Sequence, residues 1–239
     1  MPVYEPEHVE YAIVNGHVRI VTDDGAQLPA YLAYPDLSGS FPAVALIHDW
    51  WGITMTERRL ANLFAQMGYY VIIPDLFDGQ TAATPRDAMT LVEQLSNRGY
   101  LYVDTALRTM EQHVRVNNRQ VAVVGLGMGG SLAYEAALTR DDLEAAVACY
   151  GFPQRYFGRF SEAKAPILAL FGSSDPFVHG PVVTRLRREL SRSPLPHEVA
   201  LLDGLARDFF KDTRDTLPVT AVWSKIMAFL QAHLRRSPA

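Results

Sequence analysis

A glycine-rich turn in the middle of the chain is the first candidate for chemistry. The stretch VAVVGLGMGGSLAYEAA (121–137) passes from β-branched residues through four glycines into residues that favour helix. Gly125, Gly127 and Gly130 fit the G-x-G-x-x-G fingerprint, in which backbone N–H groups hold a pyrophosphate at a helix N-terminus. Gly125 and Gly129 equally fit the flanks of a nucleophile elbow, G-x-(Ser/Cys)-x-G. In that interpretation Gly127 stands where the attacking residue belongs, and the reactive atom is missing.

The composition limits the kinds of partner that such a site serves. The 239 residues are 49% hydrophobic, enough to bury one sizeable core, and the net charge of -4 offers no basic surface for nucleic acid. The first residues do not have the pattern of a signal peptide, in which a basic segment is followed by an apolar one. No apolar run approaches the roughly 20 residues of a membrane span. The single cysteine and the spacing of the histidines match no metal motif. We therefore expect a cytoplasmic protein without metal, cofactor, nucleic-acid or membrane partner, and the oligomeric state is not indicated.

Strands and helices alternate along most of the chain. An antiparallel ribbon is expected over about residues 9–35, and a core over about residues 42–236. Short β-rich runs predict core strands at 42–49, 69–75, 121–125, 144–151, 166–172 and 197–204. Parallel strands joined by crossover helices form a doubly wound sheet, so the sequence predicts an α/β fold.

Two helices in the core have clear sequence signals. Thr84, with Pro85 at the first helical position and Asp87 completing a capping-box-like pattern, predicts a helix start. The next helix has apolar residues at helical spacing that are expected to be buried, namely Val103, Leu107, Met110 and Val114.

The carboxyl ends of the predicted strands collect the residues that can act on a ligand. In doubly wound sheets, ligands bind in the crevice beyond these ends. The residues placed there or just beyond are His48, Asp49, Trp50, Asp75, Gly127, Met128, Tyr150, Asp175, Arg207 and Asp208.

The position of the glycine turn favours the elbow over the dinucleotide fingerprint. A dinucleotide site normally follows the first strand and has an acidic residue at the end of the next strand. Here the turn lies mid-chain, and the following strand ends in ACYGF without a carboxylate. FGSSDPFV instead places Asp175 after a later strand, where a triad acid belongs. An NAD(P)-binding oxidoreductase therefore remains the more remote alternative.

Six ordered motifs over about residues 30–234 resemble those of the dienelactone hydrolase family. LIHDWWGIT is similar to the family's HEWWGL, GYYVIIPDLFDGQTAATPRDAM to its GY-x-x-x-x-PDLY-x-G and TP-x-x-A segments, and VGLGMGGSLA to VG-(F/Y)-C-x-GG. CYGFP resembles YYG, LFGSSDPFV the acid loop, and LLDGLARDFFKDTR the family's YPGA-x-HAFFNDTR. The resemblance implies one α/β-hydrolase domain over residues 1–239, with a mainly parallel doubly wound sheet and an antiparallel N-terminal ribbon.

Three departures from the family pattern fall on the chemistry. Gly127 stands in the place of the nucleophilic cysteine, Arg207 in that of the catalytic histidine, and Asp49 in that of a glutamate that contacts the cysteine in relatives. Gly127 supplies no attacking atom, and Arg207 keeps its proton at physiological pH, so it cannot act as a base. Asp175 retains the acid position. Ordinary triad hydrolysis is therefore expected to be absent.

Backbone features of the site do not depend on these side chains. By resemblance, the N–H groups of Met128 and Trp50 form an oxyanion hole, which holds a carbonyl or carboxylate oxygen. We expect a pocket for a small carboxylate, ester or lactone ligand, with these binding residues: Trp50, Met128, His48, Asp49 and Tyr150. Arg207 is expected to pair with Asp175, or alternatively to bind a ligand carboxylate.

Two hypotheses about function follow. The leading one is a noncatalytic or diverged family member, a pseudoenzyme that keeps the fold and the pocket. The alternative is a hydrolase, lyase or isomerase of altered mechanism, using His48, Asp49, Asp175 and Arg207 as its ionisable groups. Structural roles are expected for three other residues, namely Ser131, Cys149 and His179.

Overall fold

A computed structural model describes residues 10–22, 25–211 and 217–234 of the chain. The predicted outer ends at residues 9 and 236, and the last three residues of the LLDGLARDFFKDTR motif (212–214), lie outside this part.

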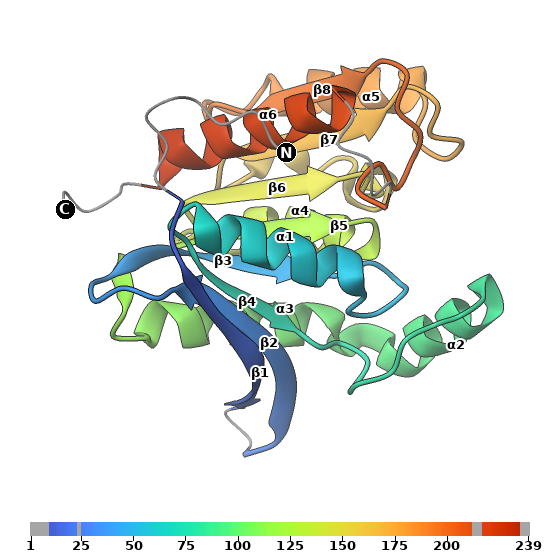
Figure 1. The fold of residues 1–239 in the computed structure, drawn as a ribbon. Helices are drawn as coiled ribbons and strands as arrows, with labels where there is room; N and C mark the ends of the chain where they lie inside the picture. Colours follow the sequence, from blue (N-terminus) through green and yellow to red (C-terminus); the bar gives the residue numbers. More distant parts are fainter. Residues whose placement is uncertain (1–9, 23–24, 212–216, 235–239) are drawn as a thin grey trace.

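One mixed sheet of eight strands runs through the protein in the order β1-β2-β4-β3-β5-β6-β7-β8 (Figure 1). The first two strands form an antiparallel ribbon, β2 pairs antiparallel with β4, and all other neighbours are parallel. The strands are β1 Ile13–Val21, β2 Gln27–Pro35, β3 Phe41–Ile47, β4 Tyr70–Pro74, β5 Val116–Leu126, β6 Ala145–Cys149, β7 Ile167–Gly172 and β8 Glu198–Leu202. The predicted α/β fold, mainly parallel with an antiparallel N-terminal ribbon, is confirmed.

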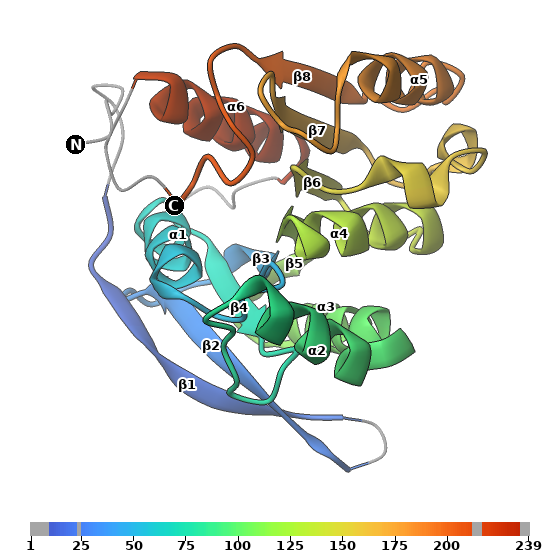
Figure 2. The same cartoon turned by 90° about the vertical axis from the view of Figure 1, so that its right-hand side faces the viewer.

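Helices cover both faces of the sheet, and each face has its own core. Within β3, Ala43, Ala45 and Ile47 belong to a buried cluster with residues of α2 to α5, and Val44 and Leu46 belong to a second cluster with residues of α1 and α6. In Figure 2, α1 and α6 lie to the left of the strands and α2 to α5 to the right. This two-sided burial explains why β3 reads as a continuous apolar run rather than an alternating one.

Local sequence signals set most helix boundaries. Thr84 caps α2 with its side chain and forms a capping box with Asp87, as predicted. The helices are α1 Met55–Gln66, α2 Pro85–Leu95, α3 Gly99–Gln112, α4 Met128–Thr139, α5 Gly180–Leu190 and α6 Leu217–His233, with single turns of 3-10 helix at η1 Ser96–Arg98, η2 Pro153–Tyr156 and η3 Phe160–Glu162. Within the described ranges, every helix is too short or too polar to cross a lipid bilayer.

One helix assignment from the sequence was wrong. Val103, Leu107 and Met110 are buried as expected, but Val114 is 92% exposed. The backbone of His113 is already extended, with φ -73° and ψ 129°, so α3 ends before Val114 and the chain turns toward β5. The apolar spacing continued past the last helical residue by coincidence.

The far end of α4 is held against α3 by a cluster of charges. Arg140, at the C-cap of α4, donates to Asp104 at 2.6 Å, to Asp142 at 2.8 Å, and to Glu111. Its side chain is only 7% exposed, so its charge is compensated almost entirely by these three carboxylates. The cluster fixes the helix that begins at the glycine turn.

Removing the cation from this cluster should lower the stability. Arg140→Met leaves Asp104 and Glu111 partly buried without their cation, and we expect a loss of about 3 kcal/mol in the free energy of unfolding. The matched control is Arg159→Met, because Arg159 is half exposed and lies 3.7 Å from Glu135. The control should lose less than about 1 kcal/mol. Urea denaturation of the two variants measures both values, and equal losses would contradict the assignment.

Candidate functional site

Steric contacts explain the glycines of the turn between β5 and α4. A Cβ atom at Gly125 would lie 2.0 Å from the carbonyl oxygen of Gly129, and one at Gly129 would lie 2.2 Å from that of Ile47. Gly127 has a φ of 53°, a conformation that residues with side chains rarely adopt. Its N–H donates to the carbonyl of Cys149 at 2.9 Å, which ties the turn to the end of β6. The turn therefore requires glycine at 125 and 129 on packing grounds alone.

The carboxylate of Asp49 occupies the space above Gly127. A Cβ atom at Gly127 would lie 2.1 Å from Asp49 Oδ1 and 2.4 Å from Oδ2. Asp49 stands two residues after β3 and is only 6% exposed. Any side chain at position 127 would therefore force Asp49 to move.

Two backbone N–H groups converge on one oxygen of Asp49. Oδ1 accepts hydrogen bonds from the N–H of Trp50 and the N–H of Met128, both at 2.8 Å. These are the two donors from which the sequence predicts an oxyanion hole. Met128 is the first residue of α4, so the positive end of the helix dipole also favours a negative oxygen here. The donors point to one site, and the chain's own carboxylate fills it.

Burial dominates the acidity of Asp49. It raises the pKa of Asp49 to about 6, because water is excluded from the charged form. The hydrogen bonds from Met128 and Trp50 lower the pKa of Asp49 and offset part of this effect. The negative charge of Asp208 raises the pKa of Asp49, and the positive charge of Arg207 lowers it. Near neutral pH, Asp49 therefore lies close enough to titration to change charge with modest acidification.

Arg207 and Asp175 are in direct contact. Arg207 Nη1 donates to Asp175 Oδ2 at 3.0 Å, and the other carboxylate oxygen accepts the N–H groups of Phe177 at 2.7 Å and Val178 at 3.1 Å. The Asp175 side chain is fully buried and that of Arg207 is 14% exposed. The buried carboxylate is thus fully compensated, and this pairing is the first of the two contacts expected for Arg207.

Aromatic rings surround the Arg207 guanidinium. Its central carbon lies 4.3 Å from the ring centre of Phe152, 5.4 Å from that of Phe177 and 5.6 Å from that of Tyr150. Tyr150 is buried, has a φ of 43°, and packs edge-on against Phe209 at 5.0 Å. Burial raises the pKa of Tyr150, so the phenol stays protonated. These contacts fix the cation by cation–π attraction as well as by its ion pair.

His48 is engaged at both ring nitrogens. Nε2 accepts the N–H of Leu76 at 3.0 Å, and Nδ1 lies 2.6 Å from the carbonyl oxygen of Asp49, to which it donates. Burial lowers the pKa of His48, so the ring is neutral. With the ring buried and both nitrogens occupied, His48 joins the chain after β3 to the chain after β4. Asp75 also braces this second segment by accepting the N–H groups of Phe77 and Gly79.

Ser131, Cys149 and His179 are the three residues for which the sequence predicts structural roles. Ser131 Oγ donates to the carbonyl of Gly127 at 3.3 Å and accepts the N–H of Phe152 at 2.9 Å. Cys149 is fully buried, and burial raises the pKa of its thiol. His179 is exposed at the N-cap of α5. Ser131 links the turn to the chain after β6, and the structural role expected for His179 stays a prediction. Among the described residues there is no group of three or more His, Cys, Asp or Glu suited to a metal ion.

The sequence did not predict every residue that contacts the site. Phe152 and Phe177, which flank Arg207, were missed, although both closely follow a strand-end residue. Lys211 was also missed: its Nζ lies 3.0 Å from Asp208 Oδ2 and 4.2 Å from the ring centre of Trp51. These contacts depend on how the loops fold together, which strand spacing does not determine.

The raised pKa of Asp49 predicts a pH-dependent stability difference on substitution. The folded pKa of about 6 lies above the ordinary value of 3.8, so between these values the folded protein binds a proton that the unfolded chain releases. The contribution of Asp49 is therefore present at low pH and is lost as the pH rises through about 6. Asp49→Asn does not titrate, so its stability relative to the original protein should rise by about 1.4 kcal/mol for each pH unit in this window. Urea unfolding at several pH values measures the difference; a pH-independent difference would show that Asp49 has an ordinary pKa.

Comparisons with known proteins identify the family of the chain. The profile of the dienelactone hydrolase family matches residues 28–234. The chain is 27% identical over 226 residues to Protein usf of Aquifex pyrophilus, covering 88% of this chain and 96% of that protein. It is also 27% identical over 222 residues to the carboxymethylenebutenolidase of Rhodococcus opacus, covering 85% of this chain and 86% of the other.

A solved structure supports the same fold. The crystal structure of dienelactone hydrolase from Anabaena variabilis superposes with a TM-score of 0.72 at 19% sequence identity, covering 93% of this chain and 99% of that one. The family match spans the ribbon strand β2, the glycine turn and the loops that carry Asp49, Asp175 and Arg207. The chain belongs to the dienelactone hydrolase family and has the α/β-hydrolase fold.

Proposed function

We propose that this protein is a noncatalytic member of its family that binds a small carbonyl or carboxylate compound and does not hydrolyse esters or lactones. Its triad is degenerate, with Gly127, Asp175 and Arg207 in the three positions. The observation that carries the proposal is the placement of Asp49 Oδ1 between the N–H groups of Trp50 and Met128, where a substrate oxygen would have to bind.

Covalent acyl transfer lacks two of its parts. The attack needs a nucleophilic atom at the turn and a base that removes its proton. Gly127 supplies no such atom, and Asp49 fills the space that a side chain would use. Arg207 is a permanent cation paired with Asp175, so it does not accept a proton. The change at each position is compensated by a new contact, which is consistent with a stable site rather than a damaged one.

The donors at the turn support binding of an oxygen ligand. The hole formed by Trp50 and Met128 already binds a carboxylate oxygen with two hydrogen bonds of good length. A ligand carbonyl or carboxylate enters by replacing Asp49 Oδ1 on these donors. Protonation of Asp49 weakens it as an acceptor and removes its repulsion of an anion. Binding of an anionic ligand should therefore strengthen as the pH falls through about 6.

One observation favours the second candidate, an enzyme of altered mechanism. A carboxyl with a pKa raised to about 6 has the acidity suited to a general base near neutral pH. In such an enzyme Asp49 would act without His48, whose two nitrogens are occupied, and without Arg207, which is paired. Loss of any detected activity in Asp49→Asn, with activity kept in His48→Gln, would favour this candidate over the noncatalytic protein.

The noncatalytic proposal predicts no covalent chemistry on activated esters. Incubation with p-nitrophenyl acetate or a dienelactone should release product at the rate of buffer alone, because Gly127 supplies no nucleophilic atom and Asp49 fills the hole. Intact-mass measurement during the reaction should show unmodified protein. An initial burst of product matched by an acyl adduct would overturn the proposal.

Restoring the chemistry should require three substitutions rather than two. Gly127→Cys with Arg207→His supplies a nucleophile and a base, but the Cβ atom of the introduced cysteine would overlap Asp49 Oδ1. Adding Asp49→Ala clears this space and empties the hole, so only the triple variant should recover weak esterase activity above background. Activity at equal rates in the double variant would show that Asp49 does not block the site.

Emptying the hole should expose its affinity for anions. We expect Asp49→Ala to bind formate, with saturable shifts of the Trp50 and Met128 amide signals in NMR titrations. Asp49→Asn is the matched control, because it also removes the charge but keeps a neutral acceptor in the hole, and it should bind formate more weakly than Asp49→Ala. Unshifted Trp50 and Met128 signals in Asp49→Ala would contradict a ligand site at the turn.

A further inference from the structure

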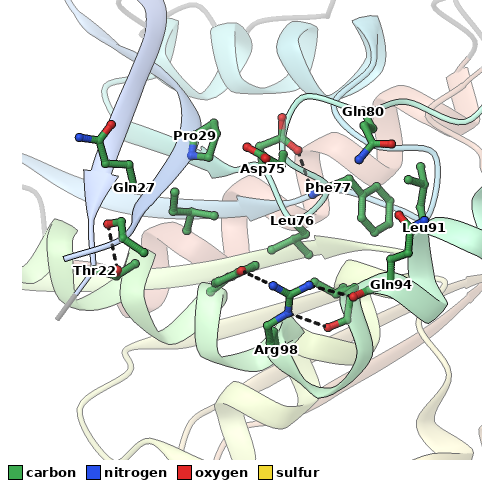
Figure 3. A pocket seen from close by; sticks show the side chains of 15 residues that line it. Thr22, Gln27, Pro29, Asp75, Leu76, Phe77, Gln80, Leu91, Gln94 and Arg98 are labelled. Carbon is green, nitrogen blue, oxygen red and sulfur yellow. Dashed lines mark hydrogen bonds between the residues drawn. The ribbon is translucent and has the colours of Figure 1, made fainter. Parts of the chain in front are cut away.

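A cavity lies beside the N-terminal ribbon, and its lining does not include Gly127 or Met128 of the glycine turn. It has a volume of about 290 Å³ and is bounded by the β1–β2 hairpin, the loop after β4, and the segment from α2 to the start of α3. Figure 3 shows the side chains that line it. Its volume lies at the small end of the range for ligand pockets.

The inner wall of the cavity is apolar. It is formed by five buried side chains from three separate elements: Leu28, Leu76, Phe77, Leu91 and Leu95. The rim is polar and includes Gln80, Gln94 and Tyr102. The cavity thus combines an apolar wall with a polar lining of about equal extent, which includes Arg98 and the carboxylates of Asp75 and Asp78.

Arg98 is an exposed residue at the rim whose guanidinium donates hydrogen bonds to three neighbouring groups. Arg98 Nη2 donates to the carbonyl of Gln94 at 2.8 Å, Nε to that of Leu95 at 3.4 Å, and Nη1 to the hydroxyl of Tyr102 at 3.3 Å. Figure 3 draws these bonds and shows the guanidinium next to Leu76. Among the described residues, no carboxylate lies within ion-pair distance of Arg98, so its positive charge has no anionic partner in this part of the chain.

The remaining hydrogen-bonding capacity suits an anion. Nη1 and Nη2 of Arg98 each carry a second proton beyond those already donated. The Tyr102 oxygen accepts from Arg98, which leaves its own proton free to donate. The carboxylate of Asp75, at the other side of the cavity in Figure 3, already accepts two backbone N–H groups and needs no cation.

Unusual backbone conformations occur at one lining residue of this cavity and in the segment that leads to Arg98. Five non-glycine residues in the described ranges have a positive φ. Two of them, Tyr150 and Asp208, lie at the glycine-turn site. Asp78, with φ 52°, lines the cavity, and Ser96, with φ 55°, ends α2 and directs the chain to Arg98. Such conformations cost on the order of 1–3 kcal/mol each and tend to cluster at functional sites.

We propose that this cavity binds a small monocarboxylic acid with an apolar body, with the carboxylate on Arg98 and the Tyr102 hydroxyl and the body against the leucine wall. A guanidinium offers a carboxylate paired, charge-assisted hydrogen bonds. The apolar body gains free energy by leaving water for the space beside Leu76, Leu91 and Leu95. The site does not depend on the function proposed for the glycine turn, because Asp49, Gly127 and Met128 do not line the cavity.

NMR titration of ¹⁵N-labelled protein with phenylacetate tests the site. We expect saturable shifts of the Arg98 Nε–H signal and of the Leu76 and Gln94 amides. 2-Phenylethanol, which keeps the ring and lacks the charge, should bind more weakly. Shifts confined to the Trp50 and Met128 amides would place the acid at the glycine turn, and the absence of saturable shifts would exclude binding; either result overturns the proposal.

Variants separate the role of the cation from a general charge effect. Arg98→Gln should weaken phenylacetate binding by at least about tenfold, the size expected for loss of a charge-assisted contact. Arg86→Gln is the matched control, because Arg86 is an exposed arginine on the preceding helix α2 and does not line the cavity. It should bind as the original protein does.

Tyr102→Phe removes one donor without touching the helix end, and it should weaken binding several-fold even if Arg98→Gln fails to fold. Undiminished binding in Tyr102→Phe and in a folded Arg98→Gln would overturn the proposal.

Discussion

The structure of the site depends on where one buried carboxylate sits. Asp49 Oδ1 is held at 2.8 Å by two backbone N–H groups from different parts of the chain, one next to it and one at the start of α4. This contact is possible only because Gly127 has no Cβ, which would lie 2.1 Å from the same oxygen. Burial makes the ionised carboxylate costly, and the two hydrogen bonds offset part of that cost. The absent side chain and the bound carboxylate are therefore two parts of one arrangement.

The pair formed by Arg207 and Asp175 completes this arrangement. A buried acid such as Asp175 requires a partner, and the Arg207 guanidinium supplies both a counter-charge and a hydrogen bond. The rings of Phe152 and Phe177 hold the cation in place beside it. Arg207 in turn lowers the pKa of Asp49, so the charges at the two positions are coupled through space. The charged groups of Asp175 and Arg207 are therefore satisfied by each other and by the surrounding chain.

The sequence was sufficient to predict the sheet and the strand ends that carry the site. It was not sufficient to predict which group binds to the N–H groups of Trp50 and Met128. The periodicity of strands and helices, together with the capping box at Thr84, predicted the sheet. It also predicted the strand ends that carry Asp49, Gly127 and Asp175. The contact between Met128 and Asp49 joins residues 79 positions apart and depends on distances of a few tenths of an ångström, which no periodicity encodes. Val114 was misplaced because its spacing fits a helix that ends two residues earlier. The cavity beside Arg98 was not foreseen, since it depends on the positive φ of Ser96 and on three elements distant in sequence.

The placement of the Asp49 carboxylate can be measured directly by NMR, through the pH titration of its ¹³Cγ signal together with the amide proton signals of Trp50 and Met128. If the carboxylate occupies the hole, all three signals titrate together with a pKa of about 6, because the same proton changes the acceptor of both N–H groups. A carboxyl that titrates near the ordinary value of 3.8, with the two amide signals unaffected, would contradict the account.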